Sequence, residues 1–211
     1  MHGSIQACFA EYDRFGAQLL GDNLQKQTTR GRILWRVDDH GKLASLYILS
    51  PVEPNINLIV RDLGEYTEKP CVTKYYAPFL QSLKKDQIWG FRLRGNPTHA
   101  VVNASRGNGR SNILGHVTAE QQINWMMNKA HMLGVEIIIK NNAPMLKISD
   151  RRVSSFAHAN TKITLNSALF DGVLRVLDPN ILAFSIINGV GRAKAYGCGL
   201  LTLAKPNDCL L

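Results

Sequence analysis

The stretch GVGRAKAYGCGLLTL, Gly189–Leu203, decides how the chain closes its fold. Four glycines stand in it beside two cations, Arg192 and Lys194, and an apolar run follows at 200–203. Glycines at this density allow positive φ angles and a close approach of the backbone to a ligand, and successive N–H groups in such a loop can form an anion site. Two interpretations stay open: a closely packed turn at the end of a helix, or a phosphate site formed by Gly189, Gly191, Gly197 and Gly199.

This loop matches neither of the common phosphate-binding motifs. A dinucleotide fingerprint needs a third glycine at the position of Lys194, and a P-loop needs Gly-Lys followed by Ser or Thr at the start of a helix. Here the pattern predicts the order helix, glycine-rich loop, strand. The loop alone therefore identifies no ligand.

Composition narrows the class of partner. The 211 residues are enough for one large or two small domains, and a hydrophobic content of 45% is sufficient for packed cores. A net charge of +9 and a pI near 9.6 favour a polyanion as the binding partner, nucleic acid first and an acidic membrane second. The alternative is that the excess positive charge serves only general solubility. The four cysteines have neither zinc-site nor disulfide-framework spacing, and we find no signal peptide or transmembrane run. These features predict a reducing, cytoplasmic setting.

Hydrophobic periodicity divides the chain into two similar halves. The first half predicts the order α-β-β-α-β, with a helix at 2–16, strands at 33–37 and 43–49, a helix at 53–63 and a strand at 71–80. The second half predicts β-α-β-β-α-β, with a strand at 89–94, a helix after Thr118, a strand at 135–139, a long hairpin at 145–176, a helix after Asp178 and a final strand. A loop at 103–116, with two arginines among Ser, Gly and Asn, reads as mobile and basic.

The order of the second half is that of a ferredoxin-like domain. The first half has the same order without its first strand, which is normally interior to the sheet. We therefore predict an α+β fold of two tandem ferredoxin-like (RRM-like) domains, with the first lacking its N-terminal strand. The predicted boundaries are 1–86 for the incomplete domain and 87–211 for the domain with the basic hairpin and glycine-rich loop.

Two motifs together resemble one family. FRLRGNPT, Phe91–Thr98, and the glycine-rich stretch resemble the CasE-type CRISPR RNA endonucleases of the type I-E Cascade complex. Those proteins carry F-R-L-R-A-N-P at the start of a second ferredoxin-like domain and end in G-[VI]-G-x-[AG]-K-x-x-G-x-G-L-L-[ST]. The spacing agrees without gaps, and Gly95 replaces the usual alanine.

The resemblance extends to the start of the chain. The family's catalytic histidine opens the first helix in Y-x-[LM]-H-x-x-[LI]-x-x-x-F, and this sequence matches from Met1 through His2, Ile5 and Phe9. The resemblance thus assigns catalysis to His2. It also implies that the natural protein extends upstream of Met1 by about one strand and a loop, roughly 15–25 residues.

A function follows from the resemblance. Members cut the CRISPR repeat transcript at the 3′ base of a hairpin, where the ribose 2′-OH attacks the scissile phosphate and no metal or other cofactor is needed. A histidine suits the proton transfers because its ordinary pKa is about 6.5. The implied partners are the CRISPR repeat RNA hairpin and the other Cascade subunits, with no membrane.

Basic side chains are the candidate RNA contacts, because proteins recognise A-form hairpins by shape and phosphates. The tip of the 145–176 hairpin, the glycine-rich loop and the 89–94 strand supply them. Solvated charge on a turn or an edge strand is the alternative for the arginines. The candidates are Arg151, Arg152 and Lys162 at the hairpin, Arg192 and Lys194 with the four glycines at the loop, and Arg92 and Arg94 on the strand.

Other histidines carry no motif, and His99 and His158 are the fallback catalysts if His2 does not act. Three classes of function stay open: a hairpin-specific endoribonuclease of Cascade, a non-catalytic RNA-hairpin-binding module, and a ferredoxin-like enzyme that binds a nucleotide or small molecule at the glycine-rich loop. Cleavage of repeat RNA in chelator separates the first from the others, and salt-dependent hairpin binding separates the second from the third.

Overall fold

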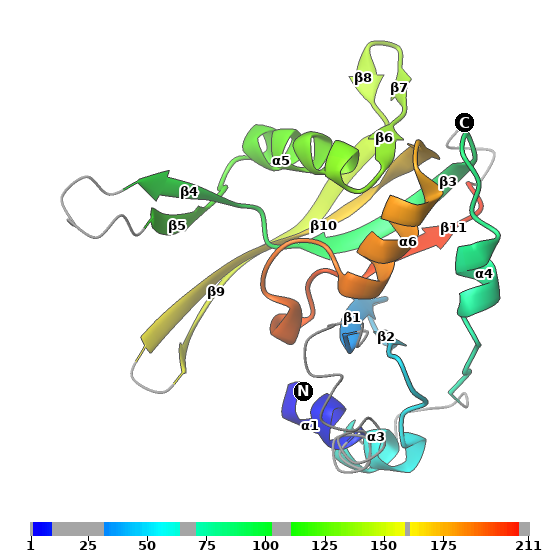
Figure 1. The fold of residues 1–211 in the computed structure, drawn as a ribbon. Helices are drawn as coiled ribbons and strands as arrows, with labels where there is room; N and C mark the ends of the chain where they lie inside the picture. The colour runs from blue at the N-terminus through cyan, green and yellow to red at the C-terminus, as the bar shows by residue number, and fades with distance from the viewer. Residues whose placement is uncertain (1, 10–31, 64–70, 103–110, 159–160, 207–211) are drawn as a thin grey trace, which may run out of the picture.

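The computed structural model describes residues 2–9, 32–63, 71–102, 111–158 and 161–206 (Figure 1). Its largest sheet is antiparallel, with the strand order β11-β3-β10-β6. In chain order these are the fourth, first, third and second strands of a β-α-β-β-α-β unit, which confirms the ferredoxin-like prediction for the second half. The strands are β3 (Ile88–Gly95), β6 (Val135–Ile137), β10 (Thr161–Val176) and β11 (Leu201–Ala204).

Two helices cover one face of this sheet. α5 (Ala119–Met132) begins at a capping box in which Thr118 and Gln121 satisfy each other's backbone N–H groups. α6 (Pro179–Asn188) begins at Asp178, whose carboxylate accepts two backbone N–H groups of the first turn. Both helices pack on the main hydrophobic core, whose fully buried side chains include Leu93, Phe170, Leu182 and Ile186.

Alternation along β3 separates the core from a charged face. Phe91 and Leu93 are buried in the core, as the sequence predicts. Because successive strand residues point to opposite faces, Arg92 and Arg94 lie on the face that α5 and α6 leave open.

The first half forms a smaller unit. α1 (His2–Ala7) and α3 (Ile56–Leu63) pack against a two-stranded sheet of β1 (Leu34–Asp39) and β2 (Ala44–Leu49). The α-β-β-α order is confirmed. Its core is a second cluster of buried side chains: Ile5, Cys8, Phe9 and Trp35.

The strand predicted at 71–80 is wrong. Residues 71–76 have no regular structure, and α4 (Ala77–Gln81) follows with Pro78 in its first turn, where proline suits a helix. Phe79 meets the edge of Trp89 with 5.4 Å between ring centroids. α4 therefore packs on the main core rather than extending the first sheet. The domain boundary at 86/87 stays a prediction.

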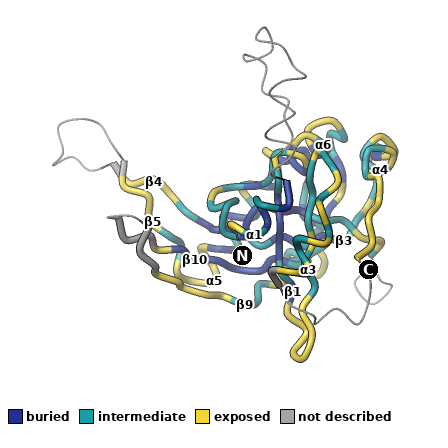
Figure 2. Tube along the Cα trace, turned by 90° about the horizontal axis from the view of Figure 1, so that it is seen from below, coloured by how far each residue is buried: buried dark blue, intermediate teal, exposed yellow. Residues whose placement is uncertain are grey.

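Two hairpin arms extend from one end of the main sheet. β9 (Leu146–His158) pairs with β10, confirming the long hairpin, and β4 (Thr98–Val102) pairs with β5 (Ser111–Gly115). β5 corrects the prediction of a loop over 103–116, of which 103–110 lie outside the described residues. Figure 2 shows that burial falls from the sheet outward along both arms. A further small hairpin of β7 (Ile139–Lys140) and β8 (Ala143–Pro144) follows β6 and was not predicted.

Candidate nucleic-acid interface

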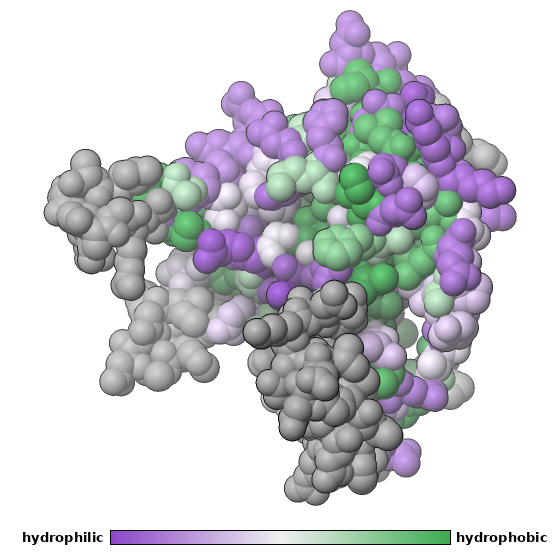
Figure 3. All heavy atoms as spheres, in the orientation of Figure 1, coloured by the Kyte–Doolittle hydropathy of each residue, from purple (hydrophilic) through white to green (hydrophobic). Residues whose placement is uncertain are grey.

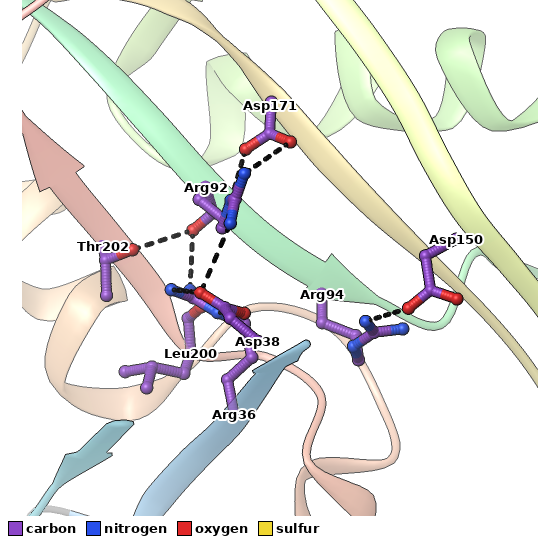
Figure 4. Close-up of polar contacts among 8 residues, drawn as sticks. All are labelled: Arg36, Asp38, Arg92, Arg94, Asp150, Asp171, Leu200 and Thr202. Carbon is purple, nitrogen blue, oxygen red and sulfur yellow. Dashed lines mark hydrogen bonds and ion pairs between the residues drawn. The ribbon is translucent and has the colours of Figure 1, made fainter. Parts of the chain in front are cut away.

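Arg92 leaves β3 on the open face of the sheet and is held by two carboxylates. Its Nε and Nη2 lie 2.6 and 3.1 Å from the carboxylate oxygens of Asp171 on β10, and its Nη1 lies 3.5 Å from Asp38 Oδ2 on β1 (Figure 4). The hydrogen bond to Asp171 is the main cause that raises the pKa of Arg92. Arg92 thus has a partner on both units of the fold, although 38% of its side chain stays exposed.

Arg94 and Arg152 share one carboxylate, that of Asp150. Arg94 donates from Nη2 to one oxygen and Arg152 from Nε to the other. Burial by itself raises the pKa of Asp150, but the hydrogen bonds from the two arginines outweigh it and hold that pKa below its ordinary value. The structure therefore brings together two of the predicted RNA contacts, from β3 and from β9.

Arg151 and Arg152 do not lie at the tip of the long hairpin, so this placement was wrong. Arg152 pairs across the ladder with Ser167, well inside the hairpin, whereas the tip lies between His158 and Thr161. Arg151 donates from Nε to Gln122 Oε1 at 3.0 Å and from Nη2 to the carbonyl oxygen of Val117. It therefore fastens the base of the β9–β10 arm to the start of α5. Figure 3 shows strongly hydrophilic residues over the region where this arm leaves the sheet.

The glycine-rich loop is closely packed against the first unit. Each of its four glycines has a positive φ, between 73° and 90°. A Cβ on Gly197 would lie 2.7 Å from the ring of Trp35, and one on Gly189 would lie 2.7 Å from Leu34. The interpretation as a packed turn is confirmed for these two positions, because only glycine fits both the φ and the space. Phosphate binding at the loop stays a prediction.

The two cations of the loop differ in their surroundings. Lys194 donates from Nζ to the carbonyl oxygen of Gly191 at 2.7 Å, and burial, followed by the nearby charge of Arg32, lowers its pKa. Arg192 is exposed. The N–H of Gly199 bonds to the carbonyl oxygen of Arg94 at 2.8 Å, which ties the loop to the strand that carries the arginines.

The sequence analysis missed a buried ion pair on β1, which lies where the first unit contacts the second. Arg36 is 2% exposed and Asp38 is 4% exposed, and they lie on the same face of β1. Arg36 donates twice to Asp38 and also to the carbonyl oxygens of Arg92 and Leu200, each at 3.1 Å (Figure 4). The only signal in the sequence is the alternation Leu34, Arg36, Asp38, which reads equally well as a solvated strand face.

The predicted catalytic histidine, His2, is the first residue of α1. Its side chain, like those of Lys162 and His158, lies outside the described part of the structure. α1 itself is anchored, because Ile5 and Phe9 pack with Trp35, and Trp35 packs under Gly197. A single tryptophan therefore joins the helix that begins at His2 to the glycine-rich loop.

Among the remaining histidines, His99 and His116 stack with 4.5 Å between ring centroids. Burial, followed by the charge of His99, lowers the pKa of His116. No group of three or more His, Cys, Asp or Glu side chains that suits a metal ion occurs within the described ranges. In those same ranges, no helix has the length and apolar character needed to cross a membrane.

This geometry defines a class: a tandem α+β protein in which a ferredoxin-like sheet presents arginines beside a glycine-rich loop. A family model described as "CRISPR associated protein" matches residues 1–205. The chain belongs to this family, and the resemblance to its CasE-type members is confirmed.

Curated relatives and solved structures agree with this assignment. The chain is 27% identical over 181 residues to the CRISPR-associated endoribonuclease Cse3 of Thermus thermophilus, covering 83% of this chain and 81% of that protein. It is 30% identical over 119 residues to the CRISPR system Cascade subunit CasE of Escherichia coli, covering 54% and 56%.

The fold matches Thermus thermophilus Cse3 bound to an RNA representing a pre-cleavage complex, with a TM-score of 0.71, 23% identity and coverage of 97% and 87%. It also matches Cas6e of Escherichia coli, with a TM-score of 0.57, 18% identity and coverage of 93% and 92%. These likenesses confirm the tandem ferredoxin-like fold.

Proposed function

We propose that this chain is an endoribonuclease that cuts CRISPR precursor RNA at the base of the repeat hairpin and keeps the product as a subunit of Cascade. Membership of the family and the names of the Thermus and Escherichia relatives support RNA processing. Retention of the product and assembly with Cascade come from the CasE-type resemblance.

One chain of contacts supports this proposal most directly. The helix that begins at His2 packs on Trp35, Trp35 packs under the glycine-rich loop, and the loop bonds to the backbone of Arg94. Arg94 in turn shares Asp150 with Arg152 at the base of the β9–β10 arm. A continuous series of packed contacts therefore connects the arginines, where the RNA stem would bind, with the start of α1.

In the proposed reaction the attacking 2′-OH loses a proton, the leaving 5′ oxygen gains one, and negative charge develops on the phosphorane. His2 would exchange protons with the attacking 2′-OH or the leaving 5′ oxygen, for which an imidazole is suited near neutral pH. Cations close to the scissile phosphate would stabilise the charge that develops on the phosphorane. Arg92, Arg94, Arg152 and Arg192 are the candidates for stem binding and for this charge stabilisation, together with Lys162 and Lys194.

The test is cleavage of a repeat RNA hairpin in excess EDTA by the wild-type chain and by His2→Ala. We expect a single cut at the 3′ base of the stem by the wild type and a loss of at least about a hundredfold in rate for His2→Ala, the scale of general acid–base catalysis. His131→Ala, an exposed histidine on α5, is the matched control and should cut at the wild-type rate. Tight hairpin binding without cleavage by the wild type would instead support the non-catalytic RNA-binding alternative.

A further inference from the structure

The strand β9 carries an irregularity at the base of its arm. Ser149 pairs with Leu169 and Arg152 pairs with Ser167, so two residues of β9 stand opposite the single residue Ala168 of β10. This is a β-bulge, a feature that redirects side chains and is frequent next to functional sites. Asp150, the first bulged residue, has a φ of +44°. Few residues other than glycine adopt this left-handed conformation, and Asp and Asn are among those that tolerate it.

The bulge turns the carboxylate of Asp150 between two arginines. Arg94 from β3 is 12% exposed and Arg152 from β9 is 57% exposed, and each occupies one carboxylate oxygen. The bond from Arg152 uses Nε, so the terminal N–H donors of its guanidinium are not needed for the bridge. A long, flexible side chain is thus fixed in one place with its outer donors still able to bind an anion.

We propose that Asp150 is a positioning residue, which holds Arg94 and Arg152 as a preorganised pair for one phosphate of the RNA stem. This inference rests on the proposed function, because it presupposes that the stem binds at the base of the arm. Because the two arginines are already fixed before binding, less side-chain entropy is lost when the RNA binds. Asp150 itself touches no RNA in this account and acts through the two arginines.

Simple electrostatics predicts that loss of the Asp150 carboxylate strengthens RNA binding. Removing a negative charge from a basic face strengthens the attraction of a polyanion and increases its dependence on salt. The positioning role predicts weaker binding in spite of the added positive charge. The two accounts therefore predict changes of RNA affinity in opposite directions.

Asp150→Asn is the direct test, because asparagine has the same shape and also tolerates positive φ. We expect about tenfold weaker binding of the repeat hairpin at fixed salt, with no such loss when Arg152→Ala is already present. Asp86→Asn is a matched control: Asp86 also has a positive φ, of 67°, but lies before β3, at the opposite end of that strand from Gly95. This control should bind as the wild type or slightly more tightly.

A second variant, Asp150→Gly, keeps the left-handed backbone free of strain and removes the carboxylate, and it should show the same loss if Asp150→Asn does not fold. The proposal is overturned if a folded Asp150 variant binds the hairpin as tightly as Asp86→Asn does. It is also overturned if the loss persists unchanged with Arg152→Ala present. A wild-type chain that binds the hairpin no better than an unstructured RNA of the same length refutes the proposed function, and this inference with it.

Discussion

Arg36→Ala tests how the two units of the fold are held together. The side chain is buried and makes four hydrogen bonds, two to Asp38 and one each to the carbonyl oxygens of Arg92 and Leu200. Among the described residues, truncation leaves the buried carboxylate of Asp38 with Arg92 alone, at 3.5 Å, and it leaves two carbonyl oxygens without this donor. Removing one partner of a buried ion pair costs about 3–5 kcal/mol, mostly because the other charge stays buried. We expect a loss of that size in the free energy of unfolding.

The assay is urea unfolding, monitored by tryptophan fluorescence and by far-UV circular dichroism. Arg175→Ala is the matched control, because Arg175 pairs with Glu136 at 3.0 Å but both side chains are substantially exposed, at 44% and 39%. An exposed pair contributes about 0–1 kcal/mol, so the control should unfold close to the wild type. A loss below about 1 kcal/mol for Arg36→Ala, similar to that of Arg175→Ala, would refute the assignment of Arg36 as the link between the units.

Three further outcomes follow from the described contacts. Gly197→Ala should lower the free energy of unfolding in urea by about 2–4 kcal/mol, because it combines a positive φ with a Cβ pressed against a tryptophan ring. Gly41→Ala, whose φ is +84° with open space around it, should lose only about 1 kcal/mol, and equal losses would contradict the packing argument. The pKa of His116 is lowered in the folded state, so the unfolded chain gains its proton first as pH falls, and wild-type stability should decline below about pH 6.5. His116→Gln should have a flatter profile of stability against pH in that range. An equally steep profile for this variant would contradict the assignment of the decline to His116. Arg152→Ala should flatten the salt dependence of hairpin binding by about one unit, and an unchanged slope across a salt series would exclude Arg152 as a phosphate contact.

Most of the second half could be predicted from the sequence, because local signals there agree with the tertiary structure. Thr118 and Asp178 cap helices, and the alternation through Phe91 and Leu93 places one face of β3 in the core. The failure at 71–80 has a physical reason. Apolar residues in that stretch fit strand and helix patterns alike, and the choice was made by aromatic packing of α4 on Trp89, a contact with a residue beyond the stretch itself.

The candidate site was predicted residue by residue but not as an arrangement. Sequence placed Arg94 and Arg152 among the candidates, yet it gave no reason to connect them, since Asp150 joins them only through a bulge in β9. It also placed Arg151 at the tip of the hairpin, whereas its contacts to Gln122 and Val117 arise from the docking of the arm on α5. Pairings of this kind depend on strand register, which hydrophobic periodicity does not specify at a bulge.

The chemistry of the cut tests the central claim most directly. A repeat hairpin RNA should be incubated in EDTA with the wild-type chain, beside the same RNA carrying a single 2′-deoxyribose immediately upstream of the scissile phosphate. We predict that the first RNA yields one upstream fragment ending in a 2′,3′-cyclic phosphate or 3′-phosphate and one downstream fragment with a 5′-OH, and that the deoxy substrate is bound but uncut. Cleavage of the deoxy substrate at the same position, or products with a 5′-phosphate, would contradict the account.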